Sequence, residues 1–212
     1  MAHRYIAVEG PIGVGKTTVV DRLAERLDAN KVLEDWATNP FLRPFYEAQP
    51  GAAFQAELFF LLSRYRQQQE LLQRQLFTQA TLTDYVFEKS RLFAYLNLDD
   101  SELLIFDKLF SLLAEGMPKP DLVVYLQAPT DVLLRRVRTR GRPEEAGFSE
   151  EYMAEVNRAY NHYFFHYSAT PLLVVNTADV DFVKNPDDLD DLLKQIRGMG
   201  KGTQYYVPRS HS

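Results

Sequence analysis

Three glycines, a lysine and two threonines lie close together near the start of the chain, in a spacing that is typical of phosphate binding. Residues 10–17, GPIGVGKT, fit the pattern G-x-x-x-x-G-K-[ST], with an apolar run before them and an amphipathic stretch after them. Glycines let backbone N–H groups surround phosphate oxygens, and the N-terminus of the following helix adds a positive dipole. The residues expected to bind a nucleoside triphosphate are Gly10, Gly13, Gly15, Lys16, Thr17 and Thr18.

Two of these side chains have distinct predicted roles. The ammonium of Lys16 reaches the outer phosphates, and the hydroxyl of Thr17 binds Mg²⁺. A glycine-rich turn without a nucleotide is the alternative, and it is disfavoured because the strand and helix that the motif requires are both predicted here.

An arginine cluster lies further along the chain and also indicates anion binding. Five arginines fall within eight residues: Arg135, Arg136, Arg138, Arg140 and Arg142. Such a density of positive charge repels itself unless an anion neutralises it, and a lid over a transferring phosphoryl group would use it. The alternative is a solvated basic helix face or a minor nucleic-acid patch.

Three acids follow predicted strands or the arginine cluster. Glu34 ends KVLE, Asp84 ends TLTD, and Glu145 lies beyond the arginines. Ligands of open α/β sheets bind at the carboxyl ends of the strands. A carboxylate there can take a proton from an attacking hydroxyl or organise Mg²⁺. Taken singly, each of these acids is more often a helix cap or a surface charge.

These side chains must be positioned by strands that alternate with helices. Apolar runs predict strands at 4–9, 31–34, 80–85, 120–128 and 171–176, and helical spacing recurs at 17–29, 52–76, 99–117, 130–140, 149–167 and 186–199. This order predicts an α/β P-loop NTPase fold with a five-stranded parallel sheet, flanking helices and an arginine-rich lid. We expect one domain over residues 1–199 and a tail over 200–212, whose last four residues resemble an expression-vector remnant.

Composition excludes several classes of protein. The chain has 212 residues, 46% of them hydrophobic, and no cysteine, which excludes disulfides, thiolate metal sites and a cysteine nucleophile. A net charge of −5 argues against duplex DNA or an acidic membrane as the main partner. No apolar run approaches the ~20 residues of a membrane span, and the first residues lack a signal-peptide pattern. We therefore expect a cytoplasmic protein.

Several segments together resemble a known family. EGPIGVGKTT, LE followed by Trp36, NPFLRPFYE, FQAELFFLLSRYRQQ, TDYVFEKSRLFA and RGRPEE occur in matching order from about Tyr5 to Tyr167. This combination resembles the deoxynucleoside kinase family, in particular its bacterial deoxyguanosine and deoxyadenosine kinase branch. The resemblance implies transfer of the γ-phosphate of ATP, with Mg²⁺, to the 5′-hydroxyl of a deoxyribonucleoside. It also implies a homodimer.

The same resemblance implies roles for individual residues. The catalytic set that it gives is Glu34, Lys16, Asp84, Arg136, Arg140 and Arg142. In that set Glu34 is the general base, Asp84 is the acid beside the magnesium, and the arginines contact the phosphates. In the nucleoside site, Tyr46 and Glu145 hold the 3′-hydroxyl, and Trp36 and Phe93 lie around the base or sugar.

The sequence departs from the family pattern at two places. Many relatives carry a base-pairing glutamine where this chain has Glu57, and an ionised carboxylate only accepts hydrogen bonds. Guanine offers adjacent N1–H and N2–H donors, which suit an ionised carboxylate at position 57. Arg64 shares the helix face of Glu57 and could donate to a purine, and Lys89 completes a group that suits guanine. Alternatively, Glu57 only neutralises Arg64 or Lys89.

The second departure is Tyr85, which follows Asp84 where many relatives have an arginine. Lys89 or a lid arginine would have to supply the missing cation. The resulting prediction is a kinase of purine deoxynucleosides that prefers deoxyguanosine to deoxyadenosine. A thymidylate-kinase-like nucleoside monophosphate kinase and a catalytically silent nucleotide sensor are the alternatives; the mainly acidic acceptor side argues against the first, and intact Lys16, Thr17 and Glu34 against the second.

Overall fold

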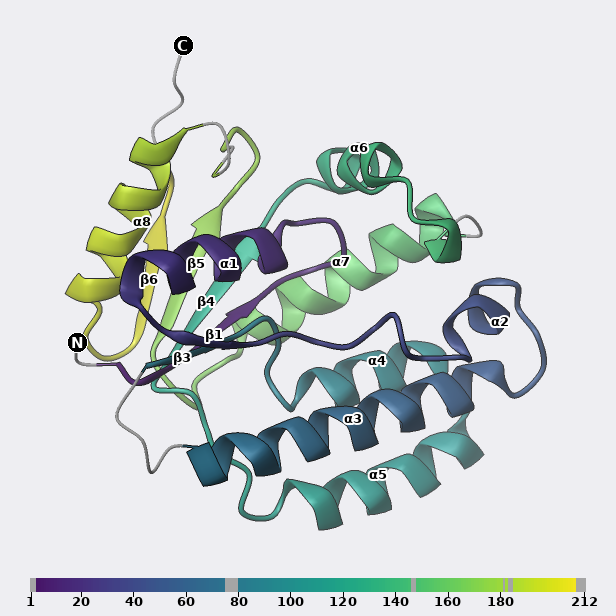
Figure 1. Cartoon of the computed structure of the whole chain (residues 1–212). Coiled ribbons are helices and arrows are strands. Elements are labelled where there is room, and N and C mark those ends of the chain that lie inside the picture. Colours follow the sequence, from purple (N-terminus) through teal and green to yellow (C-terminus); the bar gives the residue numbers. More distant parts are fainter. Residues whose placement is uncertain (1–2, 75–79, 146–147, 181, 183–184, 209–212) are drawn as a thin grey trace.

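The centre of the protein is a parallel sheet of six strands (Figure 1). The computed structural model describes residues 3–74, 80–145, 148–180, 182 and 185–208. The strand order is β2-β3-β1-β4-β5-β6. The strands are β1 (Tyr5–Glu9), β2 (Asn30–Val32), β3 (Thr81–Thr83), β4 (Leu122–Gln127), β5 (Leu172–Asn176) and β6 (Thr203–Tyr206). The predicted α/β class and parallel sheet are confirmed.

The strand count corrects the sequence-based prediction of five. The sixth strand, β6, lies in the segment 200–212 that was expected to be a tail, and it pairs in parallel with β5 from Leu172 opposite Thr203 to Val175 opposite Tyr206. Its first three residues are exposed, so it lacks the apolar pattern that marks a buried strand. The supposed vector remnant, residues 209–212, lies outside the described residues.

Helices connect the strands in nearly the predicted order. They are α1 (Lys16–Leu27), α2 (Leu42–Tyr46), α3 (Ala52–Arg74), α4 (Lys89–Asn97), α5 (Asp100–Ala114), α6 (Thr130–Arg140), the 3₁₀ turn η1 (Pro143–Glu145), α7 (Glu150–Phe165) and α8 (Pro186–Gly198). Helix α4 was missed because it is short and follows β3 closely. The predicted end of the long helix, at Leu76, lies outside the described residues. None of the described helices is both long and apolar enough to cross a membrane.

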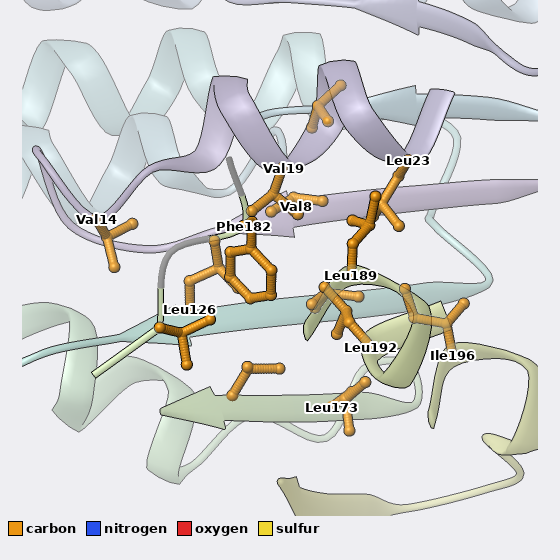
Figure 2. Packing of buried hydrophobic residues seen from close by; sticks show 14 of the residues in the cluster. Val8, Val14, Val19, Leu23, Leu126, Leu173, Phe182, Leu189, Leu192 and Ile196 are labelled. Carbon is orange, nitrogen blue, oxygen red and sulfur yellow. The ribbon is translucent and has the colours of Figure 1, made fainter. Parts of the chain in front are cut away.

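Alternate residues of the strands face two different layers of helices. On one face, Ile6 and Val8 of β1 and Leu126 of β4 pack with Val19 and Leu23 of α1, beside apolar side chains of α6 and α8. All five of these side chains are at most 1% exposed. Figure 2 shows Val8, Val19, Leu23 and Leu126 in this cluster, with Leu189, Leu192 and Ile196 of α8. Burial of this apolar surface fixes where α1 and α6 begin relative to the carboxyl ends of the strands.

The opposite face of the sheet packs against α3, α4 and α7. Tyr5 and Ala7 of β1 and Tyr125 of β4 contact this layer, in which Tyr160 and Phe164 of α7 stack with Tyr125. The aromatic segment 160–167 therefore mainly serves packing, although Phe165 is exposed. Helix α5 lies outside α3 and α4 and forms a third layer (Figure 1).

Candidate active site

The loop between β1 and α1 has the geometry of a phosphate cradle. Gly13 has φ +82°, and a Cβ added there would lie 2.7 Å from Val137 Cγ2 and 2.9 Å from Leu133 O of α6. Gly15 is the N-cap residue of α1 with φ +105°, and a Cβ added there would have no neighbour within 4 Å. No side chain in the described part of the chain caps α1. Its first N–H groups therefore lack a side-chain acceptor, which an anion bound in the loop would supply.

Lys16 lies folded over this loop. Its Nζ donates to Gly10 O at 2.7 Å and to Pro11 O at 3.1 Å. Burial and the neighbouring cation of Lys89 lower the pKa of Lys16 to about 8, although Glu9 and other nearby acids act in the opposite direction. A phosphate in the cradle would supply the anion that this ammonium needs.

The two residues predicted to bind Mg²⁺ are in contact. Thr17 Oγ1 donates to Asp84 Oδ2 at 2.9 Å, and Asp84 Oδ1 accepts from the backbone N–H of Glu34 at 2.7 Å. Burial raises the pKa of Asp84, and the charge of Glu34 raises it further. A hydroxyl and a carboxylate oxygen are hard ligands that fit Mg²⁺, which takes its remaining ligands from water and substrate phosphates.

Glu34 lies between two buried cations. Its Oε1 accepts from Arg64 Nε at 2.8 Å and from Arg64 Nη2 at 2.5 Å, and its Oε2 accepts from Lys89 Nζ at 2.7 Å. Arg64 also donates to Ser90 Oγ at 2.8 Å and lies over the ring of Phe60. Despite burial, the charges of Arg64 and Lys89 hold the pKa of Glu34 far below its usual range. The carboxylate is therefore ionised in neutral solution.

Glu57 has a different environment from the one expected. It forms no ion pair with Arg64 or Lys89, both of which contact Glu34 instead. Its Oε1 accepts from Asn97 Nδ2 at 2.7 Å, and its buried Oε2 has no hydrogen-bond partner among the described residues. Burial raises the pKa of Glu57 to about 7, although the charge of Arg64 opposes this shift. The alternative that Glu57 simply pairs with one of these cations is not supported.

The lid arginines find acceptors within the protein. Arg140 Nη2 donates to both oxygens of Glu145, at 2.6 and 2.7 Å, and Arg142 stacks on Trp36 with 3.7 Å between its Cζ and the ring centroid. Arg138 pairs with Glu150. Carboxylates of the chain thus neutralise Arg138 and Arg140, and the contact of the lid arginines with phosphate stays a prediction.

Arg136 contacts the glycine loop and the segment that follows β5. It donates to Val14 O, to Thr177 Oγ1 and O, and to Val180 O, with N–O distances from 2.6 to 3.3 Å. Together with Thr18, Arg140 and the glycine loop it lines a second hollow. Its contact with phosphate stays a prediction.

All eight residues predicted to bind the nucleoside line one pocket: Glu34, Trp36, Tyr46, Glu57, Arg64, Lys89, Phe93 and Glu145. Lys16, Thr17 and Asp84 line the same pocket, as do Arg140 and Arg142. The ring of Tyr46 packs against Phe148 and Tyr152, and burial together with the charges of Glu145 and Glu57 raises its pKa. Tyr85 is fully buried and contributes no cation.

The site residues that were missed in the sequence include Phe60, Tyr152 and Asn97. Phe60 lies under Arg64, Tyr152 lines the pocket, and Asn97 bonds Glu57. Phe60 was predictable, because it is three residues after Glu57 and four before Arg64 on one helix face. Asn97 ends the helix that was not predicted. No pattern in the sequence marks Tyr152.

A strand, a glycine-rich loop and a helix without a side-chain N-cap, beside an acid that contacts Thr17, define a P-loop nucleotide-binding protein. The model of the family "Deoxynucleoside kinase" matches residues 6–199, and the chain belongs to this family. This membership supports deoxynucleoside kinase activity rather than a monophosphate kinase or a silent sensor.

Named relatives and solved structures agree with this membership. The chain is 33% identical over 201 residues to a deoxyguanosine kinase of Bacillus subtilis, covering 91% of this chain and 96% of the relative. It is 29% identical to a deoxyadenosine/deoxycytidine kinase of the same organism, covering 92% of each. A deoxyadenosine kinase from M. mycoides with bound dATP has the same fold, with a TM-score of 0.77 at 21% identity over 92% of this chain and all of that one.

Proposed function

We propose that the protein transfers the γ-phosphate of ATP to the 5′-hydroxyl of a purine deoxynucleoside and prefers deoxyguanosine to deoxyadenosine. The observation that carries this proposal is the arrangement of charges in the pocket. Lys16 folds over the glycine loop and Arg140 lines a hollow with it, while Glu57 and Tyr46 would hold an uncharged sugar and base.

The donor side would bind ATP with Mg²⁺. The backbone N–H groups at the start of α1 and the Lys16 ammonium would bind the phosphates, and Thr17 and Asp84 would hold the metal. Bound Mg²⁺ neutralises charge that develops on the phosphoryl oxygens. Arg140 would do the same from the lid once a phosphate competes with Glu145 for its guanidinium.

Glu34 would orient the 5′-hydroxyl. The two cations that hold its pKa low keep it an acceptor, but they also weaken it as a base. It would accept a hydrogen bond from the hydroxyl first, and take the proton late, when bonding to phosphorus has made the hydroxyl oxygen more acidic. Tyr46 and Glu145 would hold the 3′-hydroxyl at the other end of the sugar.

Lys89 would supply the cation that Tyr85 does not. Its Nζ contacts Glu34, and its charge lies near enough to Lys16 to lower the pKa of that residue. The Lys89 ammonium would thus hold the general base Glu34 in place and also face the arriving phosphoryl group. This position supports a role in phosphate transfer rather than in reading the nucleobase.

The preference for deoxyguanosine rests on Glu57. Its unpartnered Oε2 and its place among Trp36, Phe93 and Arg64 suit a base that offers two adjacent N–H donors. Curated relatives with similar sequences are named for guanine and for adenine nucleosides, so only the residues of this chain argue for the choice.

We also propose that the protein forms a homodimer, as the resemblance predicts. Large apolar side chains are exposed on α5, where Leu104, Ile105 and Leu112 are 61%, 52% and 73% exposed. Exposed apolar area of this kind often marks a protein interface. Sedimentation equilibrium would measure the mass, and a monomer at micromolar concentration would contradict the proposal.

A transfer assay tests the proposed reaction. The purified protein, Mg²⁺ and γ-labelled ATP are mixed with each of the four deoxynucleosides and each deoxynucleoside monophosphate. We expect labelled 5′-monophosphate with the highest kcat/KM for deoxyguanosine. Lys16→Met is the control, because it removes the phosphate-binding ammonium without touching the nucleoside side. Label transfer to monophosphates alone, or equal product in the control, would refute the proposal.

A further inference from the structure

The two carboxylate oxygens of Glu57 are not equivalent. Oε1 accepts a hydrogen bond from the Asn97 amide, whereas Oε2 is buried without a partner among the described residues. An amide N–H only donates, so Oε1 must act as an acceptor. Any proton that Glu57 carries therefore lies on Oε2. Since Glu57 lines the nucleoside pocket, a base could bond Oε2, which has no partner, and the second lone pair of Oε1.

The two purines need opposite protonation states of Glu57. Guanine presents the donors N1–H and N2–H, and an ionised carboxylate accepts both. Adenine presents the acceptor N1 beside the N6 amino donor, which matches a neutral carboxyl group that donates from one oxygen and accepts at the other. A mismatch leaves buried polar groups unpaired and costs orders of magnitude in discrimination.

We propose that the protonation state of Glu57 selects the purine: the ionised form takes deoxyguanosine, and the neutral form takes deoxyadenosine. The proton is exchanged with solvent before the nucleoside binds, and no covalent step is involved. This inference rests on the proposed function and adds that one side chain serves both bases, with pH as the selector.

The surroundings of Glu57 allow both forms near neutral pH. The charged and titratable groups that face it are Arg64 on α3, Lys89 on α4, Tyr46 on α2, Tyr152 on α7 and Glu34 after β2. Burial raises the pKa of Glu57 to about 7. The pKa of Glu34 is held far below neutral by its cations, and burial holds the pKa of Tyr46 and Tyr152 well above it.

The test is the ratio of kcat/KM for deoxyguanosine to kcat/KM for deoxyadenosine, measured from about pH 6 to about pH 8. If one substrate requires the ionised form and the other the neutral form, the ratio follows the ratio of the two forms. It should then rise about tenfold per pH unit, whatever the pKa of Glu57. Titration of Lys16, and of any other group that both reactions need, cancels in the ratio.

Two variants assign the effect to this site. Glu57→Gln has the same shape and does not titrate, so its ratio should be independent of pH and should favour deoxyadenosine. Asn97→Leu removes the donor that favours the ionised form. Its ratio should be about tenfold lower at each pH with the slope unchanged.

Proton exchange on binding gives a readout that is separate from turnover. Calorimetry in buffers of different ionisation enthalpy should show that deoxyadenosine binds with proton uptake near pH 8 and deoxyguanosine with proton release near pH 6. A flat wild-type ratio with both nucleosides phosphorylated would overturn the inference and leave the proposed function standing. A slope that persists in Glu57→Gln would also overturn it. Failure to phosphorylate either nucleoside at any pH would overturn the proposed function itself.

Discussion

Replacement of Glu34 by glutamine tests the charge arrangement on which the proposed chemistry depends. The variant keeps the shape of the side chain but removes the negative charge that neutralises Arg64 and Lys89. These two side chains are 2% and 6% exposed and Glu34 is 14% exposed, so the cost expected for a buried pair applies rather than the ~0–1 kcal/mol of a surface pair. Breaking a buried pair costs about 3–5 kcal/mol.

We expect Glu34→Gln to lose ~3 kcal/mol in free energy of unfolding, at the lower end of that range, because the charge of Glu57 also reaches Arg64. Urea denaturation at neutral pH measures this loss. The matched control is Glu70→Gln, which removes the partner of Arg66 at 3.5 Å on the exposed side of α3 and should cost at most ~0.5 kcal/mol.

The pH dependence of this difference has a definite sign. The folded-state pKa of Glu34 lies below its unfolded value, so its stabilisation is complete above about pH 4.3 and is lost as pH falls further. The difference in free energy of unfolding between wild type and Glu34→Gln should therefore become smaller at acid pH.

Turnover of the variant should fall by about 10² to 10⁴, as for loss of a general base. If Glu34→Gln costs no more stability than Glu70→Gln, the buried ion cluster is not real and the assigned base loses its support.

Three further predictions concern the donor side. Lys89→Met should lower kcat by about 10²-fold while Lys89→Arg keeps most of it, as steady-state kinetics would show; equal losses would exclude charge as the cause. Gly13→Ala should lower the free energy of unfolding, measured in urea, by ~2 kcal/mol more than Gly116→Ala does. The backbone angle φ is similar at the two positions (+82° and +77°), but of these two glycines only Gly13 has neighbours within 4 Å of an added Cβ. Lys16→Met should abolish turnover yet raise the free energy of unfolding at neutral pH by ~1 kcal/mol, since folding lowers the pKa of this lysine; a destabilised variant would contradict that sign.

The elements that the sequence predicted well are those with a strong local pattern. The loop before Lys16 was predictable because its glycines, lysine and threonines are adjacent in the chain. Helix α6 was predicted with its observed bounds, Thr130–Arg140, because apolar residues recur at helical spacing between a proline and a glycine. Glu34 and Asp84 were found because ligand sites gather at the carboxyl ends of parallel strands, and Glu145 was found because it follows the arginine cluster.

Partners in space were harder to predict than positions in sequence. The pairing of Arg64 and Lys89 with Glu34 rather than Glu57 depends on how α3, α4 and the segment after β2 pack, which no local pattern specifies. The arginine cluster shows the same limit, because its neutralising acids Glu145 and Glu150 lie in segments whose approach to α6 is a tertiary feature. Strand β6 went unrecognised because half-exposed polar residues form a strand only where a partner edge is available.

The edge position of β6 has a practical consequence for shortened versions of the protein. The family match ends at residue 199, four residues before β6 begins. A chain cut at that boundary would leave the backbone N–H and C=O groups of β5 on that side without their partners. Bare strand edges of this kind recruit other chains and promote aggregation. Loss of solubility after such a truncation would thus reflect an uncovered sheet edge, and not damage to the catalytic pocket.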